Sequence, residues 1–105
     1  LNYTILRYFN SYGPHQVSQF VITKFMHRVT LNKSPIIYGD GSQKRSYNFS
    51  VETARGSVDS LVSAKTDSQI INLGNSNEPI TLIDLANKII HEYNEFMEQC
   101  KIDKQ

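Results

Sequence analysis

Apolar residues along the chain alternate between strand-like and helix-like spacing. Residues 3–9, YTILRYF, are rich in β-branched and aromatic side chains and predict a buried strand. Gly13-Pro14 is a turn signal that ends this first element. From Ser18, a candidate helix cap, the spacing becomes helical, with apolar residues at intervals of four: Val21, Phe25, Val29.

The middle of the chain predicts two short extended segments and a second helix. Residues 35–38 begin with proline, which is typical of an edge strand, and residues 47–49 form another extended run. Ser50 is expected to cap the helix that follows. Gly56 within that helix is unfavourable by propensity, so we expect a neighbouring element to approach it closely.

The last third of the chain predicts one strand and one helix. Residues 69–73, QIINL, form an apolar extended run, and Thr81-Leu82-Ile83-Asp84 matches a capping box before an apolar-periodic helix. The complete order is strand, helix, strand, strand, helix, strand, helix, which predicts an α/β fold. We expect a single folded part over residues 1–94 and a polar, frayed tail over residues 95–105.

Composition and charge exclude several classes of function. With 11 basic and 10 acidic residues the net charge is +1, so the sequence has no broad basic field for nucleic acid. The single cysteine, Cys100, allows no internal disulfide, and no metal site is predicted. No apolar run approaches the ~20 residues that span a bilayer. The chain begins at Leu1, next to a predicted strand, so we expect it to be a piece of a longer protein.

Three polar residues are candidates for ligand binding, and each has a structural alternative. Asn10 follows a strand, where open α/β sheets bind ligands, although asparagine there commonly just turns the chain. Arg45 follows the Gly-Asp-Gly turn and is either a phosphate clamp or a solvated loop charge. Asn72 lies between Ile71 and Leu73, where a buried amide needs a partner from backbone or ligand.

Signatures of catalysis are missing from the sequence. None of the six tyrosines has a lysine four residues later, and no glycine-rich cofactor loop follows a strand. The three histidines are far apart and lack ligand spacing. We therefore predict no catalytic residue in this chain.

Five segments together resemble the extended short-chain dehydrogenases that act on nucleotide sugars. They are LRYFNSYGPHQ at 6–16, FVITKFM at 20–26, SPIIYGDGSQKRSYNF at 34–49, ETARG at 52–56 and INLGNSNEPITLIDLANKI at 71–89. The family includes dTDP-glucose 4,6-dehydratases, UDP-glucuronate decarboxylases and UDP-sugar 4-epimerases. The resemblance implies the last strand of a Rossmann-type sheet plus the small α/β substrate-binding lobe. It also implies an NAD-dependent parent enzyme that acts through a 4-ketosugar intermediate.

The resemblance also implies roles for individual residues. Asn10, Arg45 and Asn72 would bind the diphosphate of a UDP- or dTDP-sugar, and Phe9 would lie beside the nicotinamide of NAD. The remaining contacts to the nucleotide and its base would come from Val21, Ile22, and Pro35 to Tyr38. The parent enzyme is expected to be a cytoplasmic homodimer, and this chain alone is expected to be inactive.

Departures from the family pattern leave two alternatives open. The family usually has aspartate after the arginine, whereas this chain has Ser46. Where the family commonly has a valine and an acidic residue before the next helix, this chain has Ser50 and Val51, and Glu52 is the only acid there. One alternative is a catalytically dead, dehydrogenase-derived binding or regulatory subunit. The other is an unrelated α/β interaction module in which the motifs are structural.

Overall fold

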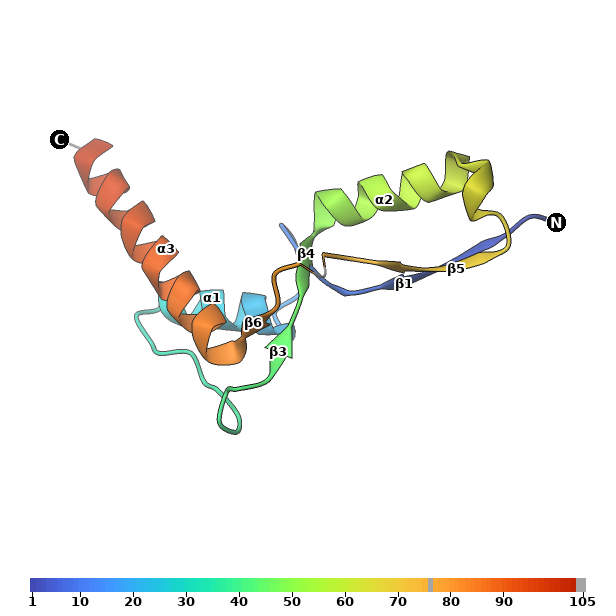
Figure 1. Ribbon diagram of the computed structural model, residues 1–105. Helices are drawn as coiled ribbons and strands as arrows, with labels where there is room; N and C mark the ends of the chain where they lie inside the picture. Colours follow the sequence, from blue (N-terminus) through green and yellow to red (C-terminus); the bar gives the residue numbers. More distant parts are fainter. Residues whose placement is uncertain (76, 104–105) are drawn as a thin grey trace. The chain divides into compact units, whose positions relative to one another are not determined.

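The computed structural model describes residues 1–75 and 77–103, and it is an α/β structure (Figure 1). The chain divides into two compact units, which are described separately: Leu1–His15 with Arg45–Pro79, and Gln16–Lys44 with Ile80–Gln105. Its elements are β1 (Thr4–Tyr8), β2 (Asn10–Tyr12), α1 (Val21–Thr30), β3 (Lys44–Arg45), β4 (Tyr47–Phe49), α2 (Ser50–Val62), the 3-10 turn η1 (Ala64–Thr66), β5 (Gln69–Leu73), β6 (Ile80–Thr81) and α3 (Leu82–Asp103).

In the first unit, β1 and β5 pair in parallel and α2 lies along one face of the pair (Figure 1). The register runs from Thr4 opposite Gln69 to Tyr8 opposite Leu73. The Tyr8 hydroxyl is 2.9 Å from Ser57 Oγ on α2. A Cβ on Gly56 would come within 2.5 Å of Leu73 Cδ1, so the close approach predicted for Gly56 is confirmed.

The first unit contains a second parallel ladder, between β2 and β4. Asn10 lies opposite Tyr47, and Tyr12 lies opposite Phe49. The Tyr12 and Phe49 rings are tilted by 56° with centroids 5.5 Å apart, a favourable geometry for an aromatic pair. The sequence predicted the extended run at 47–49 but expected a turn where β2 begins.

The second unit is held together by packing between α1 and α3. Among the described residues, the buried apolar side chains all belong to this unit: Phe25, Val29, Leu85 and Ala86. The predicted α1 stripe is therefore confirmed at Phe25 and Val29, whereas Val21, its third member, is half-buried. At the start of α3, the Asp84 N–H donates to Thr81 Oγ1 at 3.1 Å, which confirms Thr81 as the cap.

Two other predicted caps are wrong. α1 begins at Val21 after Phe20, so Ser18 lies outside the helix, and no side chain caps it. α2 begins with Ser50 itself, because Phe49 holds the extended backbone of the cap position. In both helices the orphan N–H groups of the first turn are therefore not satisfied by the predicted hydroxyl.

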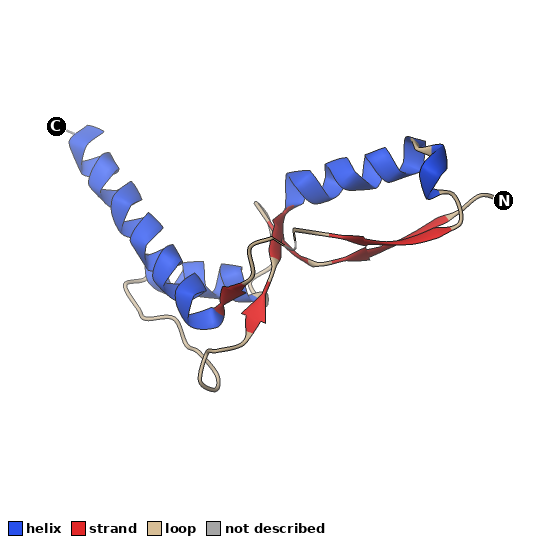
Figure 2. Ribbon diagram, viewed as in Figure 1, coloured by secondary structure: helices blue, strands red, loops and turns tan. Residues whose placement is uncertain are grey.

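Two segments differ from the predicted elements. Residues 35–38 belong to the loop between α1 and β3 rather than to a strand (Figure 2). Pro35 lacks the N–H that a ladder requires, and Ile37 packs beside Gly41 instead. At the other end, α3 continues to Asp103, beyond residue 94 where a polar tail was expected. Lys101 Nζ lies 3.8 Å from Glu98 Oε2 in this last part, a helical i,i+3 pair.

Candidate functional site

Asn10 and Arg45 lie on either side of Tyr47 in the first unit. Asn10 pairs with Tyr47 in the β2–β4 ladder, and Arg45 precedes Tyr47 by two residues. Burial raises the pKa of the Tyr47 hydroxyl, and the positive charge of Arg45 partly opposes this by lowering it. Two of the three predicted diphosphate ligands thus lie next to Tyr47, one lying opposite it in the ladder and the other lying two residues before it along the chain.

Asn72 occupies a different ladder of the same unit. It pairs with Arg7 in β1, and its side chain is exposed. Side chains alternate along a strand, so Asn72 points away from the β5 face on which Leu73 meets α2. The sequence suggested a buried amide at Asn72, and the exposed position corrects that expectation.

Phe9 is held against the backbone at the end of β5. Its N–H donates to the Leu73 carbonyl at 3.0 Å, which continues the β1–β5 pairing by one residue. A Cβ on Gly74 would overlap the Phe9 ring, so the ring rests directly on the glycine. The ring of Phe9 is half-buried, which leaves part of its apolar surface open to a planar ligand.

The second unit holds the other predicted ligand-binding residues. Val21 and Ile22 are the first two residues of α1, and both are half-buried. Pro35 is half-buried in the loop between α1 and β3, and Tyr38 on the same loop is 77% exposed. The Tyr38 ring therefore lies at the surface of this unit.

The Gly-Asp-Gly turn in the second unit is tied down at several points. Asp40 Oδ1 accepts hydrogen bonds from the Ser42 N–H at 3.0 Å and the Ser42 hydroxyl at 2.7 Å. These bonds hold the pKa of the Asp40 carboxyl below its ordinary value, with the backbone bond the larger cause. Gly39 and Gly41 have φ of 79° and 72°, which favour glycine. The Ile83 N–H donates to the Gly41 carbonyl at 3.2 Å, which fixes the turn to the start of α3.

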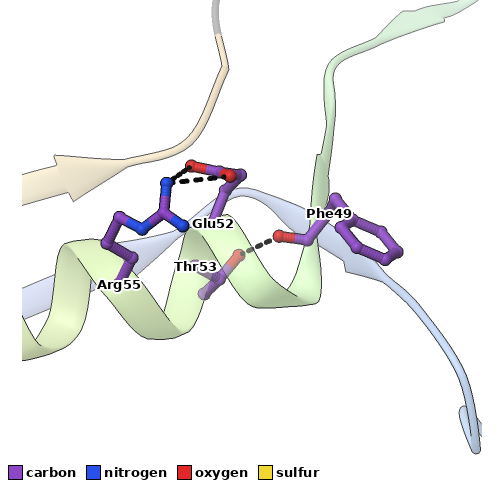
Figure 3. A network of polar contacts seen from close by, with 4 residues as sticks. All are labelled: Phe49, Glu52, Thr53 and Arg55. Atoms are coloured by element: carbon purple, nitrogen blue, oxygen red, sulfur yellow. Dashed lines mark hydrogen bonds and ion pairs between the residues drawn. The ribbon is translucent and has the colours of Figure 1, made fainter.

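Glu52 forms an ion pair with Arg55 within α2 (Figure 3). Arg55 Nη1 lies 3.3 and 3.4 Å from the two Glu52 carboxylate oxygens. The two side chains are 65% and 55% exposed, so this pair contributes little to stability. Sequence reasoning singled out Glu52 but not this partner, although the i,i+3 spacing of the two residues could have indicated it.

The described residues include several polar and aromatic groups that a ligand could contact. Within residues 1–75 and 77–103, no three histidine, cysteine or acidic side chains are grouped so as to hold a metal ion. In the same part of the chain, no helix is both long and apolar enough to cross a membrane. The Arg45 guanidinium and the Asn10 amide can donate hydrogen bonds to an anion. The half-buried ring of Phe9 can contact a flat molecule through its exposed part.

Comparisons with known proteins match most of the chain to one family. Residues 1–74 match the family model described as the NAD dependent epimerase/dehydratase family. A UDP-glucuronate 4-epimerase from Thermodesulfobacterium geofontis is 32% identical over 93 residues, or 86% of this chain and 28% of the relative. This chain therefore spans less than a third of the length of that relative.

Two solved structures show the same partial coverage. An epimerase from the methanogen Methanothermobacter thermautotrophicus has a TM-score of 0.78 and 31% identity, with 90% of this chain and 28% of that chain covered. A UDP-glucuronic acid 4-epimerase from Bacillus cereus, in complex with UDP-glucuronic acid and NAD, has a TM-score of 0.71 and 32% identity. Coverage there is 77% of this chain and 26% of that chain. The fold described above is thus similar to one part of these Rossmann-type enzymes.

Proposed function

Because this chain belongs to the NAD-dependent epimerase/dehydratase family, we propose that it is the nucleotide-sugar-binding portion of such an enzyme. Its ligand would be a UDP- or dTDP-sugar, held mainly through the diphosphate. The parent enzyme would act through a 4-ketosugar, and this portion by itself would be inactive. The choice of ligand is supported by the solved structure of the Bacillus cereus epimerase, which is a complex with UDP-glucuronic acid and NAD.

The observation that carries the proposal is the grouping of Asn10, Tyr47 and Arg45. A diphosphate carries about two negative charges, and a chain of net charge +1 must hold it with a few directed donors. The planar guanidinium of Arg45 can give two parallel hydrogen bonds to phosphate oxygens, and the Asn10 amide can give another. Tyr47 is neutral at physiological pH, as a phenol of ordinary pKa near 10 is, and burial raises that pKa further, so it adds a donor and no opposing charge.

The residues at the end of β1 and β5 fit the nicotinamide part of NAD. The half-buried ring of Phe9 on Gly74 offers a flat apolar surface, and an aromatic face suits a planar heterocycle. Bound NAD would supply reversible removal of hydride from the sugar. Phe9 would exclude water from one side of that position. Asn72, on β5, would contribute its amide to the diphosphate rather than to the nicotinamide.

The second unit would contribute to recognition of the nucleotide. Val21 and Ile22 would present backbone and apolar contacts from the first turn of α1. Pro35 and the exposed ring of Tyr38 would flank the base. These contacts are less directional than a guanidinium–phosphate pair, so we expect them to add affinity without fixing which sugar is bound.

The proposal is tested by mapping backbone amide shifts of the 105-residue chain by NMR during titration with UDP. Uridine at the same concentrations is the matched control, because it carries the base and ribose but no diphosphate. We expect UDP, but not uridine, to shift the amides around Asn10, Tyr47 and Arg45. Equal shifts with both ligands, or no response to millimolar UDP from a chain with a dispersed spectrum, would instead favour an interaction module.

A further inference from the structure

Three polar side chains from β2, β4 and α2 meet next to the Asn10–Tyr47 pair. Thr53 Oγ1 lies 3.1 Å from Ser11 Oγ and accepts a hydrogen bond from Asn48 Nδ2 at 2.8 Å. Ser11 Oγ donates to the backbone carbonyl of Asn48 at 3.1 Å. We refer to these contacts as the Ser11–Asn48–Thr53 ring.

One assignment of hydrogens satisfies all three contacts at once. The Asn48 amide donates to Thr53, the Thr53 hydroxyl donates to Ser11, and the Ser11 hydroxyl donates to the Asn48 carbonyl. Each hydroxyl then uses its single proton once and still accepts a bond. The Thr53 hydroxyl can instead donate to the Phe49 carbonyl at 3.4 Å, a longer bond that competes for the same proton (Figure 3).

The Ser11–Asn48–Thr53 ring joins two strands, β2 and β4, whose pairing register is otherwise defined by few hydrogen bonds. β2 and β4 have three residues each, so few backbone hydrogen bonds and side-chain pairs define which residues lie opposite. A slip by one residue would turn every side chain of a strand to the other face. Ser11 and Asn48 are directly opposite in the ladder, and Thr53 ties both of them to α2.

Alternation along the strands connects the ring to the candidate anion site. The side chains of Ser11 and Asn48 point toward Thr53 on α2. Their neighbours Asn10 and Tyr47 therefore point to the opposite face of the ladder. We propose that the Ser11–Asn48–Thr53 ring is a positioning device that sets Asn10 against Tyr47 and Arg45 for anion binding. This inference rests on the proposed function, since it assigns the residues that shape the same site.

The test compares three variants of the 105-residue chain by NMR and by UDP affinity. Thr53→Val removes the hydroxyl that joins the ring while keeping the β-branched shape and similar helix propensity. Thr53→Ser returns a hydroxyl at the same atom. Thr30→Val is the matched control, because the Thr30 hydroxyl donates to the His27 carbonyl in α1 at 2.8 Å, in the other unit.

We expect Thr53→Val to weaken cross-strand NOEs between Asn10 and Tyr47 without ligand and to weaken UDP binding roughly tenfold. Thr53→Ser should recover most of both, and Thr30→Val should change neither. Ser11→Ala removes the hydroxyl at the other side of the ring and should act in the same direction, so the proposal does not depend on one variant folding.

A purely structural role predicts something different. If Thr53→Val lowers the unfolding temperature but the NOEs and UDP affinity match those of the original chain, the positioning role is overturned and the proposed function stands. If the original chain does not bind UDP, the proposed function fails, and the NOEs alone decide whether the ring sets the register.

Discussion

Gly74 lies directly beneath the ring of Phe9, and a Cβ at that position would overlap the ring. Phe9 is also tied to the same strand end by its N–H bond to Leu73. Backbone and ring are thus held together where β1 and β5 finish, so the glycine is required by close approach rather than by its φ. This contact links a residue with no side chain to the aromatic surface that we assign to the cofactor.

Gly74→Ala should force the Phe9 ring away from the end of β5. The ring is attached to a strand end that is hydrogen-bonded, so we expect a cost of about 1–3 kcal/mol in the free energy of unfolding. Thermal or urea unfolding measures the cost, and the Phe9 ring proton shifts report the displacement.

Gly39→Ala is the control for this change, because a Cβ on Gly39 would meet nothing within 4 Å. Its φ of 79° still makes alanine unfavourable, by about 1 kcal/mol. Both variants should therefore lose stability, but only Gly74→Ala should move the Phe9 resonances. Unchanged Phe9 shifts in Gly74→Ala would contradict the close contact.

The turn at Asp40 should loosen in acid. Its carboxyl has a pKa below the ordinary value because it accepts bonds from Ser42, so the folded turn favours the ionised form. The stabilisation is therefore present above about pH 4, the ordinary pKa of aspartate, and is lost as the pH falls through the lower folded value. The Ser42 amide shift as a function of pH measures this transition.

Asp40→Asn separates charge from hydrogen bonding in that turn. The asparagine oxygen can still accept from the Ser42 N–H, so the turn should persist while the acid transition of the Ser42 amide disappears. Asp40→Ala removes the acceptor and should loosen the turn at Ser42 at every pH. A Ser42 amide that titrates in Asp40→Asn as in the original chain would show that another group is responsible.

Tyr47 should report on the charge at Arg45. Arg45→Gln removes the positive charge that favours the phenolate, so the pKa of Tyr47 should rise further above its ordinary value. Bound UDP should raise it as well, because a nearby anion disfavours the phenolate. Since the folded pKa exceeds the unfolded one, this contribution to stability is present below about pH 10 and is lost as the pH rises through the folded value.

The Tyr47 titration is measured by the ¹³Cζ shift, which resolves it from the other five tyrosines. Arg55→Gln, which removes a guanidinium paired with Glu52 in the same unit, should leave the Tyr47 pKa in place. If the Tyr47 pKa does not change in Arg45→Gln, the Arg45 charge does not reach the Tyr47 hydroxyl. That result would remove the basis for a site shared by the two residues.

Local sequence patterns predicted the parts of the fold that depend on near neighbours. The stripe of Val21, Phe25 and Val29 placed the buried face of α1, and the hydroxyl of Thr81 caps α3 as its spacing with Asp84 indicated. The strand at 69–73 was also predicted, since a short apolar run between turns has few other outcomes.

Features that depend on distant pairing were not predicted. Ser11 and Asn48 are separated by 37 residues, and no local pattern indicates that they lie opposite each other in a parallel ladder. The run at 35–38 looked like a strand because β-branched residues suit one, but a strand also needs a partner. For the site, the turn residues and resemblance indicated Arg45, whereas the role of Gly74 required knowing where the Phe9 ring lies.

The affinity of UDP for the 105-residue chain and for Arg45→Lys, measured by calorimetry, tests the central claim most directly. Lysine keeps the charge but loses the two-pronged donor, and Arg45 is exposed, so screening limits the loss to about 3- to 30-fold. Arg55→Lys makes the same exchange at an arginine of α2, outside the proposed site, and should bind UDP as the original chain does. Equal affinity in the original chain and Arg45→Lys, or equal losses in both variants, would contradict a diphosphate site at Arg45.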